Sequence, residues 1–353
     1  MFKISALPAS YGDCLWIEYG TEDAPFVILV DAGPSEPKAL KSRLKQLATQ
    51  GRFLELVVVT HVDRDHIGGI LNLLENDFYG VKVRDLWFNG FRHLPSPDAL
   101  EAFGEKQGEQ LTKLILEKKI AWNAVLDNAG FMVTPEQCPE FELLGGAKIT
   151  LLSPDAEQLK NLRANWVKVC GEADLYADIP AQAMYFGKGD MEAFGAENLN
   201  IPTLAGLPFS EDTSEANGSS IAFIIEYDGK RVLLGADAYP SRILKSLEKI
   251  AGNPSFSFDL VKVPHHGSEN NVSKEFIEAL DCRRYLFSTN GSYYRHPSQP
   301  AVSRIIQFGD HPELIFNYRS AYSKIWDNDM LKSIYHYSTS YGDGDGDGIT
   351  VAL

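Results

Sequence analysis

The chain has 353 residues and a formal net charge of −15. This length is sufficient for one large α/β domain with its own core. The excess of carboxylates excludes broad, non-specific adhesion to nucleic acid or anionic membranes, which needs excess Lys and Arg, although it leaves room for a local basic groove. Apolar runs then predict strands that open the chain as a β-meander, at residues 2–7, 14–19 and 26–30.

The next predicted elements alternate between helix and strand. Leucines at helical spacing predict a helix at residues 39–48, and the run LELVVV predicts a buried strand at 54–59. We expect a metal-binding loop after this strand, then a helix that starts at residue 70, then a strand at 83–88. This alternation is typical of an α/β sheet.

Residues 101–128 have a helical pattern, and later apolar runs predict strands at 147–152, 220–227, 231–234, 260–263, 284–287 and 349–353. Residues 155–215 have weak periodicity, and we expect there an insertion that is either a lid, a substrate pocket or a purely structural excursion. The glycine- and aspartate-rich run at 342–348 predicts a turn rather than a calcium loop, because the twelfth ligand position would fall beyond Leu353. The chain is therefore expected to form a single domain over residues 1–353.

The cysteines and the amino terminus bear on the compartment. Four cysteines lie far apart, with no C-x-x-C pair, so the sequence predicts neither a disulfide framework nor a thiolate zinc site. The amino terminus lacks a basic segment followed by a long apolar core, and no window approaches 18 apolar residues. We expect a cytoplasmic protein without membrane insertion.

The stretch T-H-V-D-R-D-H-I-G-G at residues 60–69 places four ligand-type side chains within six positions, namely His61, Asp63, Asp65 and His66. It follows a predicted strand, and the carboxyl ends of strands are where open α/β sheets place their chemistry. A lone His or Asp is usually structural, but four such residues at this spacing indicate metal binding.

Three later loops also follow predicted strands. The strand VLLGAD ends at Asp237, which alone would be a helix cap but whose two oxygens can bridge two cations. His265 and His266 are adjacent and point in different directions, so we expect one to bind metal and the other to face substrate. The loop FSTNGSYYRHPS carries Asn290 and His296, and we expect His296 to contact the substrate or the transition state.

These loops supply enough nitrogen and oxygen ligands for two divalent cations with open positions for water. Such a pair activates water and stabilises the attacking and leaving oxygens, so hydrolysis is the predicted reaction. Because carboxylates contribute much of the donor set, manganese is as credible as zinc.

The order of these residues resembles the metallo-β-lactamase superfamily. The usual H-x-H-x-D-H motif has Asp63 here in place of the second His, and the resulting H-x-D-x-D-H is similar to the hydrolase domain of ComEC-type DNA-uptake proteins. Further ComEC-like features are Gly12-Asp13, the N-G-S-S segment at 217–220, V-P-H-H-G-S, His296-Pro297 and the closing Asp347-Gly348-Ile349. The membrane-spanning segments of a DNA channel are missing from this sequence.

The resemblance implies an α/β fold, the four-layered αββα metallo-β-lactamase sandwich. It implies His61 and Asp63 as ligands of one metal, a bridging Asp237, and a second metal held by Asp65, His66 and His266. Asp31 would orient the histidine loop from behind the ligands. Asn217 stands where a ligand is lost, so it is expected to hold a water or a substrate oxygen instead.

The leading hypothesis is a two-metal phosphodiesterase or nuclease that acts on nucleic acid or nucleotides. Asp65 is required in it, and His265 or His296 stabilises the transition state. The acidic charge and the aromatic side chains of the expected insertion at residues 155–215 favour an alternative, a hydrolase of a small ester, lactone or phosphocholine-like substrate. A second alternative is a catalytically decayed metal-binding module that acts through a protein partner or as a homo-oligomer.

Overall fold

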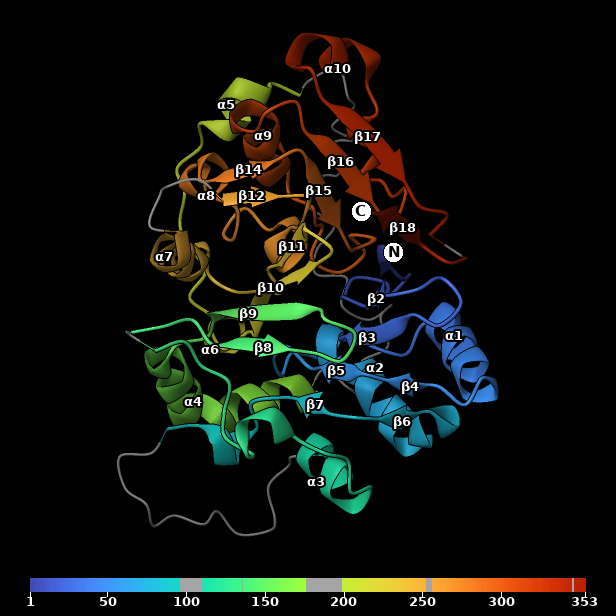
Figure 1. The fold of residues 1–353 in the computed structure, drawn as a ribbon. Coiled ribbons are helices and arrows are strands. Elements are labelled where there is room, and N and C mark those ends of the chain that lie inside the picture. The colour runs from blue at the N-terminus through green and yellow to red at the C-terminus, as the bar shows by residue number, and fades with distance from the viewer. Residues whose placement is uncertain (96–109, 135, 176–198, 252–255, 345) are drawn as a thin grey trace.

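The computed structural model describes residues 1–95, 110–134, 136–175, 199–251, 256–344 and 346–353. Two β-sheets pack face to face, and helices cover both outer faces (Figure 1). Both chain termini lie close to the edge strand β18, which pairs with β1.

The first sheet has six strands in the order β18-β1-β2-β3-β5-β7. The opening meander and the final strand are confirmed. Strand β3 pairs in parallel with β5, and β5 pairs in parallel with β7. The bounds are β1 Phe2–Ala6, β2 Leu15–Tyr19, β3 Phe26–Val30, β5 Leu56–Val58, β7 Leu86–Trp87 and β18 Ile349–Ala352.

Two predicted strands of this sheet are each divided into two. Short strands β4 (Phe53–Leu54) and β6 (Lys82–Val83) pair with each other outside the main sheet. Between the halves, the buried carboxylate of Glu55 lies 2.9 Å from Arg84 Nε. This ion pair joins the two breaks, because Glu55 lies between β4 and β5 and Arg84 lies between β6 and β7.

The second sheet has eight strands in the order β17-β16-β15-β13-β11-β10-β9-β8. The predicted hairpin is confirmed as antiparallel β10 and β11, and the strands from β11 to β17 run parallel. The bounds are β8 Glu140–Glu142, β9 Lys148–Ser153, β10 Ala222–Tyr227, β11 Lys230–Leu234, β13 Leu260–Lys262, β15 Arg284–Phe287, β16 Glu313–Phe316 and β17 Ser338–Tyr341. A two-stranded ribbon, β12 (Phe256–Phe258) with β14 (Leu280–Cys282), lies beside it.

Buried residues form three clusters, and these define the layers. One lies between the sheets and joins Ile4, Ile17, Phe223 and Leu286 among others. Another packs the first sheet against helices α1 (Lys38–Thr49), α2 (Arg64–Glu75), α3 (Gln110–Glu117) and α4 (Ala156–Leu175). The third packs the second sheet against α5 (Ile201–Ala205), α7 (Pro240–Ala251), α8 (Lys274–Glu278), α9 (Gln299–Phe308) and α10 (Asp329–Tyr335). The fold is therefore an αββα sandwich of the α/β class.

The expected helix start at residue 70 is wrong, because α2 begins at Arg64 with Asp63 at its N-cap. Asp65 and His66 consequently lie on the first helical turn rather than on a loop. The expected helix at 101–128 is confirmed in part, by α3 at Gln110–Glu117, after which only a short 3-10 turn follows; residues 101–109 lie outside the described residues. Lys119 and Asn123 have positive φ angles of 54° and 50°, which an α-helix cannot accommodate.

The segment expected to be an insertion begins as the regular helix α4. Leu159, Leu162 and Trp166 on this helix are buried in the core of the first sheet, so the start of the segment belongs to a helical layer. Residues 176–198 lie outside the described residues, and a lid or pocket role for them stays a prediction. Among the described helices, none has the length and apolar character needed to cross a bilayer.

Candidate metal centre

The candidate ligands converge on one carboxylate, that of Asp237, which follows β11. Four imidazole Nε2 atoms lie around Asp237 Oδ2, at 3.4 Å for His66, 3.6 Å for His265, 3.7 Å for His266 and 3.9 Å for His61. These residues follow strands of both sheets, β5 in the first and β11 and β13 in the second. The centre is thus built where the carboxyl ends of these strands meet.

Asp65 supplies a second carboxylate beside this group. Its Oδ2 lies 3.4 Å from His266 Nε2 and 4.0 Å from His66 Nε2. Three sets of donor atoms are compact enough for one cation each, with all atoms within 4.8 Å of one another, and one of them joins Asp13, Asp31 and His66. The two that face the centre are His61, His66 and Asp237, and Asp65, His66 and His266. The second set is the trio that the family resemblance implies.

Several inward-facing donor atoms lack a hydrogen bond within the described part of the chain. Among the described residues, no hydrogen bond satisfies the buried Nε2 atoms of His61, His66 and His266 or Asp237 Oδ1. Leaving such atoms unpaired costs about 1–3 kcal/mol each, and imidazole nitrogen with carboxylate oxygen is the donor set that Zn²⁺ and Mn²⁺ take. The residues present therefore fit divalent cations.

Electrostatics support the same assignment. Burial alone would raise the pKa of Asp237, but the facing imidazoles, led by His66, hold it well below its ordinary value. The pKa of Asp65 is lowered too, because His66 and His266 outweigh the effect of burial. Both carboxylates are thereby kept ionised, as metal ligands must be.

Asp31 lies behind the histidines and orients them. Its Oδ1 accepts the Thr60 backbone N–H at 2.9 Å, while its Oδ2 accepts Thr60 Oγ1 and His66 Nδ1, each at 2.7 Å. Thr60 Oγ1 in turn lies 3.0 Å from His61 Nδ1. With both Nδ1 atoms engaged in this way, the two Nε2 atoms face the centre.

The Ser288 carbonyl accepts a hydrogen bond from His266 Nδ1 at 2.9 Å, and Asp13, for which we predicted no role, lies beside the same nitrogen. Asp13 Oδ1 is 3.2 Å from His266 Nδ1, and its Oδ2 forms a fully buried ion pair with Lys262. Gly12 lets the preceding turn lie against the start of α2, since a Cβ there would lie 1.9 Å from the backbone oxygen of Asp65. In the sequence, the signal for Asp13 is the Gly12-Asp13 turn, which is one of the ComEC-like features.

His265 faces Asp237 through Nε2, and polar side chains lie around its Nδ1. Nδ1 donates to Asn271 Oδ1 at 2.9 Å and lies 3.3 Å from Asp212 Oδ2. Asn217 Nδ2 donates to the same Asp212 oxygen at 2.6 Å. The structure thus joins Asn217 to His265 through Asp212. Neither Asp212 nor Asn271 was predicted, because no motif surrounds either residue.

The remaining predicted residues lie further out. Asp63 is 36% exposed, with Oδ2 3.6 Å from His61 Nε2, and it is absent from all three compact donor sets. The His296 ring lies 5.4 Å from that of His265, and burial lowers the pKa of His296 to about 3, so its ring is neutral. Asn290 Oδ1 accepts the Ser292 N–H at 2.9 Å and so stabilises its own loop; a substrate contact by Asn290 remains a prediction.

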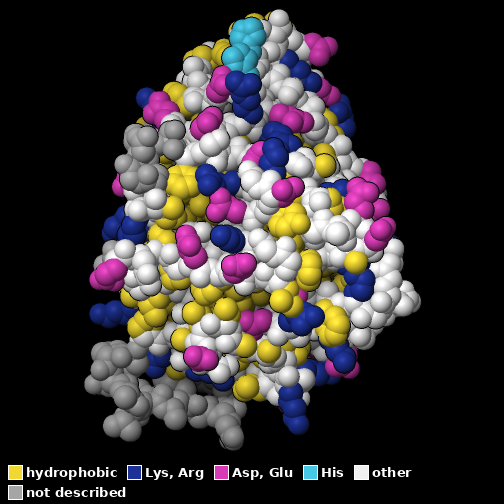
Figure 2. All heavy atoms as spheres, viewed as in Figure 1, with side chains coloured by type: hydrophobic (Ala, Val, Ile, Leu, Met, Phe, Trp, Pro, Cys, Tyr) yellow, Lys and Arg dark blue, Asp and Glu magenta, His cyan; other side chains and the backbone are white. Residues whose placement is uncertain are grey.

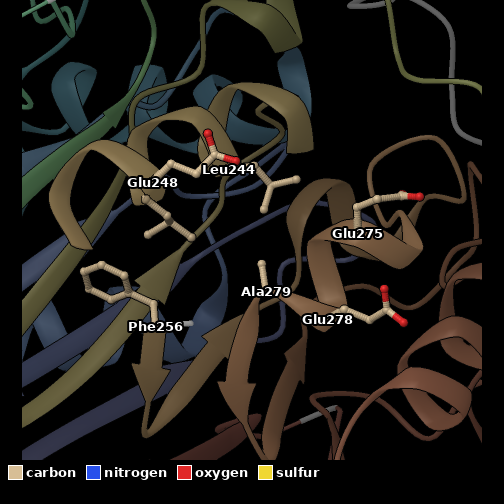
Figure 3. Close-up of a pocket in the computed structure, with 7 residues that line it drawn as sticks. Leu244, Glu248, Phe256, Glu275, Glu278 and Ala279 are labelled. Atoms are coloured by element: carbon tan, nitrogen blue, oxygen red, sulfur yellow. The ribbon is translucent and has the colours of Figure 1, made fainter. Parts of the chain in front are cut away.

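A separate pocket of about 300 Å³ lies between α7, α8 and β12 (Figure 3). Its lining combines apolar side chains with Glu248, Glu275 and Glu278, and it includes none of the candidate site residues. On the face shown in Figure 2, acidic and basic side chains are interspersed among apolar ones.

Comparisons with known proteins agree with the fold. Residues 8–127 match the family model of the metallo-β-lactamase superfamily. ComE operon protein 3 of Bacillus subtilis (strain 168) is 30% identical over 98 residues, which is 27% of this chain and 12% of that protein. The chain therefore spans only about an eighth of the length of this curated relative.

Three solved structures are similar over essentially the whole chain, at low identity. Zn(2+)-bound PqqB from Methylobacterium extorquens has a TM-score of 0.41 at 11% identity, covering 99% of this chain and 100% of that one. A CmlA beta-hydroxylase E377D mutant has a TM-score of 0.41 at 12% identity, covering 100% and 53%. A diphosphatase from the PhnP family has a TM-score of 0.36 at 10% identity, covering 100% and 98%. Residues 8–127 thus resemble the metallo-β-lactamase superfamily, and the αββα sandwich agrees with that resemblance.

Proposed function

We propose that the chain is a two-metal phosphodiesterase that acts on nucleic acid or nucleotides. The observation that carries this proposal is the convergence of four imidazole Nε2 atoms on Asp237 Oδ2, with Asp65 beside them. Three of these nitrogens are buried and make no hydrogen bond among the described residues. A core that only needed stability would have no use for so many inward-facing polar atoms.

When bound, two divalent cations would lower the pKa of a water molecule and neutralise charge on the phosphoryl oxygens. Asp237 lies centrally and would hold both cations. Asp65, His66 and His266 would hold one of them, and His61 with Asp63 would complete the other. This ligand assignment follows the family pattern, and one compact donor set, Asp65, His66 and His266, agrees with it.

His265 and His296 are proposed to contact the substrate. The Nε2 of His265 faces the centre, while Asp212 and Asn271 fix the ring through Nδ1. His296 lies beside it as a neutral ring that can donate one hydrogen bond. Two such groups can stabilise the oxygens of a phosphoryl transition state.

The carboxylate content of the centre favours a phosphodiester over a carboxylic ester. Asp65, Asp237 and the neighbouring Asp63 provide oxygen donors, which suit hard cations such as Mn²⁺. Hard cations bind phosphoryl oxygens well, and two-metal sites recur in enzymes that cleave phosphodiesters. A local phosphate-binding site is also compatible with the overall negative charge of −15.

The test compares Mn²⁺- and Zn²⁺-loaded protein on bis-p-nitrophenyl phosphate, single-stranded DNA and p-nitrophenyl acetate. We expect cleavage of the two phosphodiesters, and loss of at least a hundredfold in rate for Asp65→Ala and His66→Ala. Asp310→Asn is the matched control, since this carboxylate is exposed and pairs with Arg283 away from the centre. Cleavage of the acetate alone, or undiminished diester cleavage by both site variants, would refute the proposal.

A further inference from the structure

Three tyrosines form a compact aromatic cluster, which we call the tyrosine cluster: Tyr11, Tyr293 and Tyr294. Tyr11 and Tyr293 stack at 5.0 Å between ring centroids, with 25° between their planes. Tyr294 stands at 79° to both of them, at 4.4 Å from Tyr293 and 6.1 Å from Tyr11. The cluster therefore presents ring planes in two nearly perpendicular orientations.

The cluster adjoins the candidate metal centre. Tyr294 lies nearly parallel to His296, with 5.9 Å between the ring centroids, and His296 is the neighbour of His265. Burial and the nearby carboxylates of Asp65 and Asp63 raise the pKa of the Tyr294 phenol. Tyr294 nevertheless leaves 48% of its surface exposed, so an aromatic ring next to the centre remains accessible to a ligand.

The charges around the cluster indicate which ligand it suits. Arg64 lies close enough to Tyr11 to lower its pKa, against the larger effect of burial, which raises it. Arg295 is exposed and stands between Tyr294 and His296 in the chain. The positive charge of Arg64 beside Tyr11 suits a ligand in which an aromatic ring carries a phosphate.

We propose that the tyrosine cluster is a subsite that stacks a nucleobase of the substrate, with the attached phosphate directed toward the metal centre. The inference rests on the proposed phosphodiesterase function and narrows its substrate class to nucleotide-containing diesters. Planar bases stack on aromatic side chains whatever their sequence, at about 1–3 kcal/mol per base. Perpendicular ring planes allow one face contact and one edge contact to the same base.

The test measures binding rather than turnover. Isothermal titration of the Mn²⁺-loaded protein compares thymidine 5′-monophosphate with ribose 5-phosphate, which lacks the base. We expect about tenfold tighter binding of the nucleotide, consistent with one stacked base. Tyr294→Ala abolishes this preference, whereas its binding of ribose 5-phosphate stays within twofold of the wild type. Tyr294→Phe keeps both the ring and the preference, which separates stacking from a role of the hydroxyl.

Equal affinity of the wild type for the two ligands would overturn the proposal, as would an unchanged preference in Tyr294→Ala. A nucleotide preference in a protein that cleaves no phosphodiester would retain the subsite and reject the proposed function instead. A trinucleotide distinguishes the sources of the base. Tighter binding than the mononucleotide identifies a strand as the ligand, and equal binding identifies a free nucleotide. Thermal unfolding of each variant verifies that it folds.

Discussion

The buried pair Asp13–Lys262 makes a sharp prediction about stability. The two side chains are 3% and 1% exposed, and among the described residues Lys262 Nζ has no hydrogen-bond partner beyond this ion pair. Asp13→Ala would therefore leave an ammonium group uncompensated in the interior, at a cost of about 3–5 kcal/mol. Adding Lys262→Met removes that charge and nearly conserves the volume of the side chain.

We therefore expect the double variant Asp13→Ala/Lys262→Met to be more stable than Asp13→Ala alone, by about 2 kcal/mol or more. Urea unfolding in the presence of EDTA measures this without any contribution from bound metal. If the two sites were independent, the second substitution would instead lower the unfolding free energy further. Identical or lower midpoints in the double variant would refute the assignment of Lys262 as a charge that depends on Asp13.

Three further predictions concern Asp31 and Asp212, which contact the histidines of the centre, and the buried His93, whose ring packs edge-on against Trp122. Asp31→Asn removes a carboxylate that holds His66, and we expect metal affinity to fall about 10- to 100-fold in a titration with Mn²⁺ or Zn²⁺; unchanged affinity would contradict its orienting role. Asp212→Ala frees His265, so diester cleavage should fall about 10- to 100-fold while metal content by mass spectrometry stays that of the wild type. Burial lowers the pKa of His93 from 6.5 to about 4, so the unfolded chain takes up its proton first as the pH falls. The stability that neutral His93 contributes is complete above about pH 6.5, and about 3 kcal/mol of it is lost as the pH falls toward 4. In His93→Gln the unfolding free energy should therefore depend less on pH over that range.

The predictable parts of the fold are those where local pattern and burial agree. The strand at Phe26–Val30 is apolar throughout, and it lies in the interior of the first sheet. The run at residues 54–59 predicts one strand, because hydrophobicity cannot reveal that Glu55 pairs with Arg84 between β4 and β5. The sequence predicts the start of α2 at residue 70 rather than Arg64, because the polar ligands of its first turn interrupt the apolar pattern of the helix.

The site shows the same division between local and distant information. His61, Asp65 and His66 share one motif, so their proximity could be read directly from spacing. Asp212 reaches His265 across more than 50 positions and follows a stretch without periodicity, so only the folded chain brings them together. Asp13 is an intermediate case, because its turn was recognisable but its pairing with Lys262 depends on the two sheets meeting.

Because the candidate ligands come from both sheets, a bound cation would act as a cross-link between two halves of the sandwich. The segment that matches the superfamily model, residues 8–127, contains His61, Asp65 and His66 but neither Asp237 nor His266. A fragment limited to that segment would lack two of the six proposed ligands, however well its own sheet formed. Cation binding would thus report whether the sheets have docked, and it would stabilise the docked state by an amount that grows with free metal concentration.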